Sequence, residues 1–429
     1  MEETLSVKKQ LKISIPIATE NFINILMTLV DTLVIATLGT NELGAIGAMA
    51  VVLNFMQMSI QSINVSNMAI LAKAQGEKNK KEMKLLTGNA VMITTLIAII
   101  TILIIYGIKP IFPQLFNVDK ICITYMTIRL IGFIQSSIVT ILAGHQRTIG
   151  KQGNIMILRM IAVVCNLLLD LFVVKLDYGV EGVAWVTVGI DTALSIYLIL
   201  KSKSTVKYKF QKNMIKEIFN LFKWNCVERI VARVDQFVFN ILVSRIGPIE
   251  YAVHVILIQI ADVSQAFVQG FSDGISISIG IETGNQNKES IEIAKKVIRK
   301  IINIFSVIVP VAVTMIAIVI AHIFLRENEL LVIFYSVLPL LVIGQYAEIS
   351  GTYYYGILRG MREFKFLAQR NFMTSIIKIV VATVLSYSML GIIGVWIAYT
   401  VYCLVQKYIS KYKYKMLEKN REEFKCYLS

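Results

Sequence analysis

Long stretches without a charged side chain constrain this chain more than any other feature of its sequence. Residues 91–106 and 304–324 contain no Asp, Glu, Lys or Arg, and similar apolar runs recur along the chain. A helix needs about 20 apolar residues to cross roughly 30 Å of hydrocarbon. Of the 429 residues, 56% are hydrophobic and 17% are charged, too few to cover a soluble fold of this size. The sequence predicts a polytopic membrane protein and excludes an ordinary cytosolic enzyme.

The apolar runs predict an all-α fold with twelve transmembrane helices. The first run is too long for a signal-peptide core and lacks a small-residue cleavage site, so it is counted as a span. The expected spans are 13–38, 43–72, 85–108, 121–144, 153–175, 179–201, 218–246, 250–280, 293–323, 329–357, 366–388 and 390–410.

Basic residues are distributed unevenly between the two ends of these spans. Of the 43 Lys and Arg, 33 fall at one end and in the tail, five fall at the other end, and five lie inside spans. The positive-inside rule then predicts a plasma or inner membrane protein with both termini in the cytoplasm. The net charge is +15, and the basic residues lie mostly in short loops. No segment interleaves basic with aromatic residues as a nucleic-acid-binding surface would, so nucleic acid is not an expected partner. The basic tail, 411–429, is expected to be solvated and attracted to anionic lipid.

The two halves of the chain resemble each other. Gly39 and Gly76 are 37 residues apart, and Gly247 and Gly284 repeat that spacing at an offset of 208. Later matches, such as Arg147 with Arg359, have an offset of 212. We therefore expect two pseudo-symmetric six-helix lobes, at 1–201 and 218–410, joined by a cytoplasmic linker at 202–217. Parallel repeats of this kind enclose a midplane cavity in many transporters and rock to alternate access.

Ionisable residues within the first-half spans are functional candidates, because a charge in hydrocarbon is costly. Asp31 lies in the first span, fifteen residues after Pro16, which is expected to kink that helix. Asn166 and Asp170 share one face of the fifth span, and Thr187 lies in the sixth. These oxygens could hold Na⁺, or the carboxylates could carry protons. The alternative is a structural Asp–Asn hydrogen bond that joins spans one and five.

The second half carries a different set of charges. Span seven holds Glu228, Arg229, Arg233 and Asp235, which are expected to pair among themselves. Glu348 in span ten is either an acid of the substrate cavity or the partner of Lys378 in span eleven. The candidate residues of a substrate cavity are therefore Glu20, Glu228, Asp235, Glu348 and Lys378. Three further acids near span ends are expected to reach water: Asp191, Asp262 and Asp273.

Several ordered motifs resemble a known transporter family. The first span reads P-x14-D-T-L-V-I-A-T-L-G over 16–39, span five reads CNLLLDLFVV, and span six opens with GVEGVAWVT. AGHQRTIGK and YGILRGMRE follow at equivalent places after spans four and ten. From about residue 8 to 410 the chain resembles multidrug and toxic compound extrusion (MATE) transporters, within the wider multidrug/oligosaccharidyl-lipid/polysaccharide flippase superfamily.

The resemblance implies two six-helix lobes and export of organic, often cationic compounds driven by inward Na⁺ or H⁺. By position, Asp31, Asn166, Asp170 and Thr187 match the family's first-lobe cation site, with Na⁺ expected at the first three. Glu348 matches a second-lobe acid that one branch has as Asp. The span-seven acid of that branch falls on Ala232, so we expect coupling in the first lobe.

The resulting hypothesis is an antiporter that works by rocking-type alternating access. A flippase for a lipid-linked oligosaccharide or another lipid-linked substrate is the alternative, because Arg229, Arg233 and Lys378 could meet a diphosphate. An intramembrane enzyme is not expected, since the chain has no HExxH and no nucleophile–base pair. We expect no cofactor beyond the coupling ion, small organic substrates and membrane lipid as partners, and a monomer.

Overall fold

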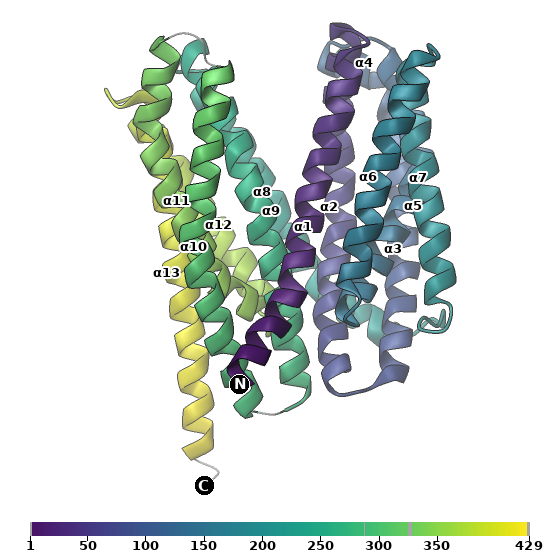
Figure 1. Ribbon diagram of the computed structural model, residues 1–429, viewed down its shortest axis with the longest axis vertical. Coiled ribbons are helices and arrows are strands. Elements are labelled where there is room, and N and C mark those ends of the chain that lie inside the picture. The colour runs from purple at the N-terminus through teal and green to yellow at the C-terminus, as the bar shows by residue number, and fades with distance from the viewer. Residues whose placement is uncertain (1, 287, 325–327, 427–429) are drawn as a thin grey trace. The chain divides into compact units, whose positions relative to one another are not determined.

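The apolar runs end at short turns, and the chain between the turns is helical. Hydrocarbon offers no hydrogen-bond partner, so the backbone polar groups of each span must be paired within its own helix. The computed structural model describes residues 2–286, 288–324 and 328–426, without the side chains of 2–6, 28–33, 36, 40, 288, 323–324 and 420–426. This part contains twelve long helices (Figure 1): α1 Glu2–Ala36, α2 Thr40–Gly76, α3 Lys80–Ile108, α5 Ile121–Thr148, α6 Gln152–Lys175, α7 Gly179–Ser202, α8 Lys212–Ser244, α9 Pro248–Gly284, α10 Lys288–Phe324, α11 Asn328–Gly360, α12 Phe364–Ser386 and α13 Gly391–Cys426. A 3-10 turn, Lys109–Ile111, and the short α4, Phe112–Phe116, join α3 to α5.

The twelve long helices confirm the predicted number of spans. Within the described residues, nine of them are long and apolar enough to cross a membrane, and α1, α8 and α12 fall outside that set. Helices α8 and α12 carry charges in their interiors, including Asp235 and Lys378. Two ion pairs, described below, join these two polar spans.

The internal repeat is visible in the backbone. Residues with positive φ, a conformation that most side chains avoid, occur at repeat-equivalent positions in both halves. The pairs have φ values of 56° and 55°, 85° and 66°, and 57° and 49°: Lys78 with Gln286, Gly150 with Arg362, and Gly179 with Gly391. The first pair has the offset of 208 and the other two have 212. The same turns therefore join equivalent helices in the two halves, which confirms the two-fold repeat.

The chain forms two compact units. The N-terminal unit comprises residues 19–226 and 280–286, and the C-terminal unit comprises the described residues of 1–18, 227–279 and 287–429. Helix α1 is divided after Ala18 and α8 after Cys226, two positions that are themselves 208 residues apart. These units place the start of α1 in the C-terminal unit and the start of α8 in the N-terminal unit. The lobe boundaries predicted at 201 and 218 therefore stay a prediction.

In the C-terminal unit, the first half of α1 packs closely on α9. A Cβ added at Gly270 would lie 2.3 Å from the Cα of Ala18, and one at Gly274 would lie 2.3 Å from the Oγ of Ser14. Small residues four apart on both helices permit this approach. The core of the unit lies among α8 to α13, with Trp396 fully enclosed.

In the N-terminal unit, the end of α2 crosses the last turns of α9 at a pair of repeat-equivalent glycines. A Cβ at Gly76 would lie 2.0 Å from the carbonyl oxygen of Ile281, and one at Gly284 would lie 2.1 Å from that of Lys73. Neither position has room for a side chain. Two apolar clusters, centred on α2, α3, α5 and α7, form the core of this unit.

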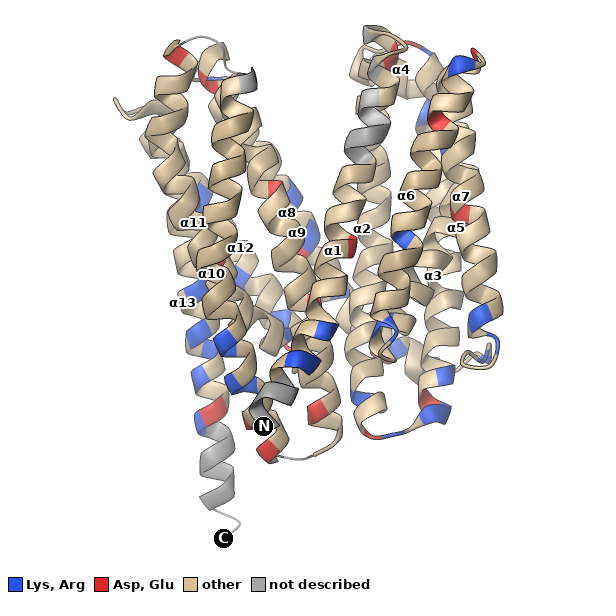
Figure 2. Ribbon diagram, viewed as in Figure 1, with Lys and Arg blue, Asp and Glu red and all other residues tan. Residues whose placement is uncertain are grey.

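Helix α13 continues through the segment expected to be a basic tail. Tyr414 is 5% exposed and packs against Tyr353 and Tyr354 of α11. The buried Nζ of Lys295 on α10 lies 2.9 Å from Oε1 of Glu418. The first turns of the tail are therefore packed on this unit and not freely solvated. Figure 2 shows Lys and Arg of the C-terminal unit gathered toward the end of the helices that bears both chain termini.

Candidate functional site

The first group of candidate residues meets on α6. The Nδ2 of Asn166 donates a hydrogen bond to Oδ2 of Asp170 at 2.6 Å, as their spacing of four residues allows. Both side chains are buried, at 1% and 0% exposure. The Oδ1 of Asn166 is also buried and accepts no hydrogen bond from a described residue. An acceptor oxygen and a carboxylate thus lie together inside the N-terminal unit.

Thr187 lies on the neighbouring helix. Gly179, with its positive φ of 57°, starts α7 and turns the chain so that α7 packs against α6. The side chain of Thr187 is buried, and its hydroxyl donates to the carbonyl of Val183 at 3.2 Å. Its donor is therefore satisfied within the helix, and the oxygen keeps lone pairs for a cation.

Asp31 and Pro16 both belong to α1. The side chain of Asp31 lies outside the described residues, so its predicted approach to Asn166 and Asp170 stays a prediction. Pro16 lies within the continuous helix α1, two residues before the division between the units after Ala18. Among the described side chains, no group of three or more His, Cys, Asp or Glu is placed to hold a metal ion.

Glu20 forms a buried ion pair within the N-terminal unit. Arg147 on α5 donates to it twice, from Nε at 2.9 Å and from Nη2 at 2.5 Å. The Nε of Arg159 on α6 lies 3.7 Å from the same carboxylate. A fully buried carboxylate with two arginines near it joins α1, α5 and α6. Arg147 and Arg159 were not among the candidate site residues.

Asp235 and Lys378 form a buried ion pair within the C-terminal unit. The Nζ of Lys378 lies 2.6 Å from Oδ2 of Asp235, and both side chains are less than a tenth exposed. The ammonium also lies over the rings of Phe239, at 4.3 Å, and Tyr402, at 5.0 Å. The expectation that Asp235 pairs within span seven is wrong, since its partner is on α12.

Glu228 on α8 likewise interacts with residues of α11 and α12. Its Oε1 accepts a hydrogen bond from the Tyr355 hydroxyl at 2.9 Å and lies 3.9 Å from Nη2 of Arg370. Its carbonyl oxygen accepts from Asn371 at 2.9 Å. Of the two span-seven arginines, Arg233 is exposed and donates to Gln236 of its own helix.

The prediction that Asp273 reaches water is wrong. Asp273 is buried and lies 3.0 Å from Nη1 of Arg359, which also donates to Ser272. The expectation of a water-exposed acid fails because α9 runs on to Gly284, which leaves Asp273 eleven residues inside the helix. The repeat relation of Arg359 to Arg147, which binds Glu20, was the available signal that Arg359 also needs an acid.

Glu348 is half-buried and does not bind Lys378. It accepts hydrogen bonds from the side-chain amide of Gln265 and from the hydroxyl of Tyr399, the latter at 3.4 Å. Of the two expectations for this residue, the pairing with Lys378 is wrong, because that ammonium is taken by Asp235.

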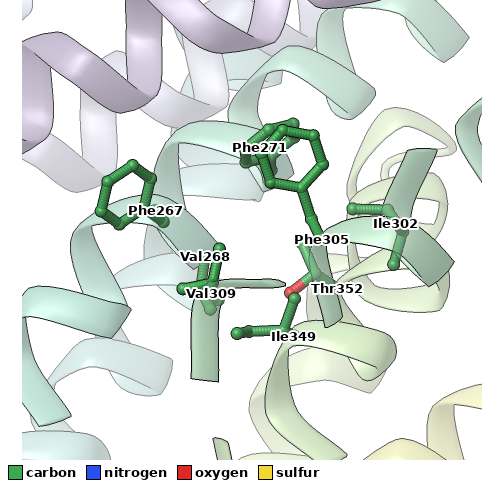
Figure 3. A pocket seen from close by; sticks show the side chains of 8 residues that line it. All are labelled: Phe267, Val268, Phe271, Ile302, Phe305, Val309, Ile349 and Thr352. Carbon is green, nitrogen blue, oxygen red and sulfur yellow. The ribbon is translucent and has the colours of Figure 1, made fainter. Parts of the chain in front are cut away.

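A small apolar pocket lies within the C-terminal unit, between α9, α10 and α11 (Figure 3). Phenylalanine rings from α9 and α10 line it, and those of Phe271 and Phe305 lie 4.7 Å apart. Ile349 and Thr352 of α11 form another wall, and Thr352 supplies the one polar side chain among the eight that Figure 3 draws. The lining of this pocket is therefore almost entirely apolar.

Comparison with protein families gives a match in both halves of the chain. The MatE family model matches residues 16–172 and again residues 226–384. The chain belongs to the MatE family. Its two matched segments coincide with the two copies of the repeat, and a MatE chain with twelve long helices is a multi-pass membrane transporter.

Solved MATE structures share this fold. A MATE transporter of Vibrio cholerae, VcmN, in an aspartate-to-asparagine variant, is 15% identical, with a TM-score of 0.90 and coverage of 97% of this chain and 98% of that one. A multidrug resistance MATE transporter in an outward-facing conformation is 18% identical, with a TM-score of 0.87 and coverage of 96% and 95%. A MOP superfamily transporter from Pyrococcus furiosus gives the same values. Comparison with curated protein sequences gives no match.

For this MatE chain, the structure separates the sequence candidates into two classes. Glu20, Glu228, Asp235 and Lys378 take part in ion pairs or hydrogen bonds between helices. Asn166 and Asp170 instead form a small polar group, in which the Oδ1 of Asn166 accepts no hydrogen bond from a described residue. Such a group is costly in a membrane unless something else binds there.

Proposed function

We propose that the chain is a secondary active antiporter that exports small organic, often cationic compounds in exchange for Na⁺ or H⁺. The coupling cation binds in the N-terminal unit, at Asp31, Asn166, Asp170 and Thr187. The observation that carries this proposal is the buried Oδ1 of Asn166, which accepts no hydrogen bond from a described residue beside the carboxylate of Asp170. Oxygens of this kind bind an alkali cation, and a carboxylate in the same place binds a proton.

The proposed mechanism is alternating access of two rocking lobes, with both termini in the cytoplasm and the transporter acting as a monomer. Cation binding at the acids neutralises them and favours a changed first helix around Pro16, which releases the drug outward. The cation then leaves inward while new drug loads. Coupling requires only that cation and drug favour different states.

For the substrate cavity we propose Glu348 as the acid that meets a cationic substrate. Its carboxylate is half-buried, and Ile349 and Thr352 of the same helix line the aromatic pocket of Figure 3. Lipophilic cations combine a positive charge with an apolar body, so an acid near aromatic side chains suits them. Glu20, Glu228, Asp235 and Lys378 are already bound within the protein, which supports a structural role for them.

The alternative is a flippase for a lipid-linked substrate, which would need free cationic side chains for a diphosphate. The ion pairs of Lys378 with Asp235 and of Arg359 with Asp273 count against it. For the Pyrococcus furiosus transporter of similar fold, a reversed polarity of the binding pocket was taken to suggest a different function.

The test is dye efflux in everted vesicles with the variants Asp31→Asn and Asp170→Asn. An amide can take neither the proton nor the negative charge, so both variants are expected to lose gradient-driven export while inserting normally. Glu181→Gln, an exposed acid at the start of α7, is the matched control and is expected to export like the wild type. Unimpaired efflux by either Asn variant would refute the assignment.

A further inference from the structure

The C-terminal unit contains positions equivalent to the candidate cation site of the N-terminal unit. The offset of 212 places Lys378 at the position of Asn166, Ala382 at that of Asp170 and Tyr399 at that of Thr187. The offset of 208 places Phe239 at the position of Asp31. The positive-φ turns at Gly150 and Arg362, and at Gly179 and Gly391, fix the later offset in the backbone on both sides of Lys378.

The equivalent residues meet in the C-terminal unit. The ammonium of Lys378 lies 4.3 Å from the centre of the Phe239 ring, so the equivalents of Asn166 and Asp31 are in direct contact. In place of the acid at Asp31, the chain supplies Asp235 one turn earlier on α8, at 2.6 Å from the Lys378 Nζ. The ring of Tyr402 faces the same ammonium at 5.0 Å.

A carboxylate with two aromatic faces is an arrangement that binds ammonium groups and other organic cations. Here the cation is covalently part of the chain, and its side chain is 7% exposed. The second oxygen of Asp235, Oδ1, is buried and accepts no hydrogen bond from the described residues. The surroundings thus have the charge and the acceptors of a cation site, with Lys378 as the occupant.

We propose that the C-terminal unit retains the repeat-equivalent of the cation site, and that Lys378 fills it as a tethered cation that does not exchange. The coupling cation then binds in the N-terminal unit alone, one site per chain. The equivalence to a cation site and the number of exchanging sites both rest on the proposed function. The occupancy by Lys378 is a property of the C-terminal unit and can be tested without transport.

The first test replaces the tethered cation with a free one. Lys378→Ala removes the atoms from Cγ to Nζ, which correspond to n-propylammonium. In purified full-length protein, the variant is expected to lower Tm by on the order of 10 °C, because Asp235 is left buried and unpaired. Millimolar n-propylammonium is expected to restore at least half of that loss and to leave the wild type unchanged.

Two controls separate a cation site from an empty cavity. 1-Propanol fills similar space without charge and is expected to restore little, and the double variant Lys378→Ala/Asp235→Asn is expected not to respond to n-propylammonium. Equal rescue by the alcohol, rescue of the double variant, or no rescue of a folded Lys378→Ala would each overturn the proposal. Adding Asp31→Asn to Lys378→Ala should leave the rescue of Tm intact. Thermal rescue therefore tests the C-terminal unit, and ion-driven export tests the N-terminal site.

The second test uses the wild-type chain and does not depend on the folding of a variant. Amine-reactive labelling of vesicles, read by mass spectrometry, is expected to modify the exposed Lys216 and to leave Lys378 unmodified, both at rest and during transport. Labelling of Lys378 that rises with transport would mean that its ammonium leaves Asp235 in the cycle, which contradicts a tethered, resident cation.

Discussion

Arg147 holds Glu20 through two hydrogen bonds, from Nε at 2.9 Å and Nη2 at 2.5 Å, between α5 and α1 of the N-terminal unit. Glu20→Gln removes the buried carboxylate that Arg147 and Arg159 approach. Breaking a buried ion pair in this way costs about 3–5 kcal/mol. Thermal unfolding in detergent should show a clear loss of stability.

The matched control is Glu77→Gln, which removes a partly exposed contact of 3.5 Å to Lys73. Such surface pairs contribute about 0–1 kcal/mol. Equal losses in the two variants would mean that the burial of Glu20 does not matter to its pairing.

The crossing of α2 and α9 makes a second prediction. Gly284→Ala places a methyl group about where the carbonyl oxygen of Lys73 lies, 2.1 Å from the new Cβ. The helices must move apart, so the variant is expected to unfold at a lower temperature. Gly189→Ala on α7 meets nothing within 4 Å and should be neutral or gain up to about 1 kcal/mol from helix propensity. A Gly284→Ala variant as stable as Gly189→Ala would contradict this close crossing.

Substrate charge gives a third prediction. If Glu348 meets the cationic part of the substrate, Glu348→Gln should raise the KM for a cationic dye at least several-fold and change little for a neutral one of similar size. The measurement is export as a function of dye concentration. Glu329→Gln, an exposed acid in the first turn of the same helix, serves as the control. A uniform change for both dyes would indicate a structural role for Glu348.

The amide of Asn166 gives a fourth prediction. Asn166→Leu keeps a similar volume but removes both the donor to Asp170 and the acceptor oxygen. The variant is expected to insert and fold but to require a higher concentration of the coupling ion for half-maximal export, by tenfold or more. Thr192→Val on α7 removes a hydroxyl that donates to the carbonyl of Val188 in its own helix, and is expected to behave like the wild type. An unchanged ion dependence for Asn166→Leu would exclude its oxygen as a ligand.

The sequence predicted the architecture well because its signals are periodic and local. Apolar runs predicted twelve helices, and glycines at constant offsets predicted the repeat that the positive-φ turns confirm. The i, i+4 spacing predicted the contact of Asn166 with Asp170, since a single helix fixes it.

The ion pairs between helices could not be predicted in the same way. Whether Lys378 reaches Asp235 or Glu348 depends on how α8, α11 and α12 are rotated about their axes, which no local pattern encodes. Asp273 was misjudged because its distance from the helix end was underestimated. Repeat equivalence was the stronger signal, because it relates Arg359 to Arg147, and each binds a buried acid.

The central claim is that a cation moving through the N-terminal unit drives export. Purified protein in proteoliposomes, given an Na⁺ gradient or a pH gradient separately, tests it most directly. The account predicts that at least one gradient drives movement of a cationic dye against its own gradient, and that Asp170→Asn abolishes this while Glu181→Gln does not. Dye movement independent of both gradients, or gradient-driven movement that persists in Asp170→Asn, would contradict it.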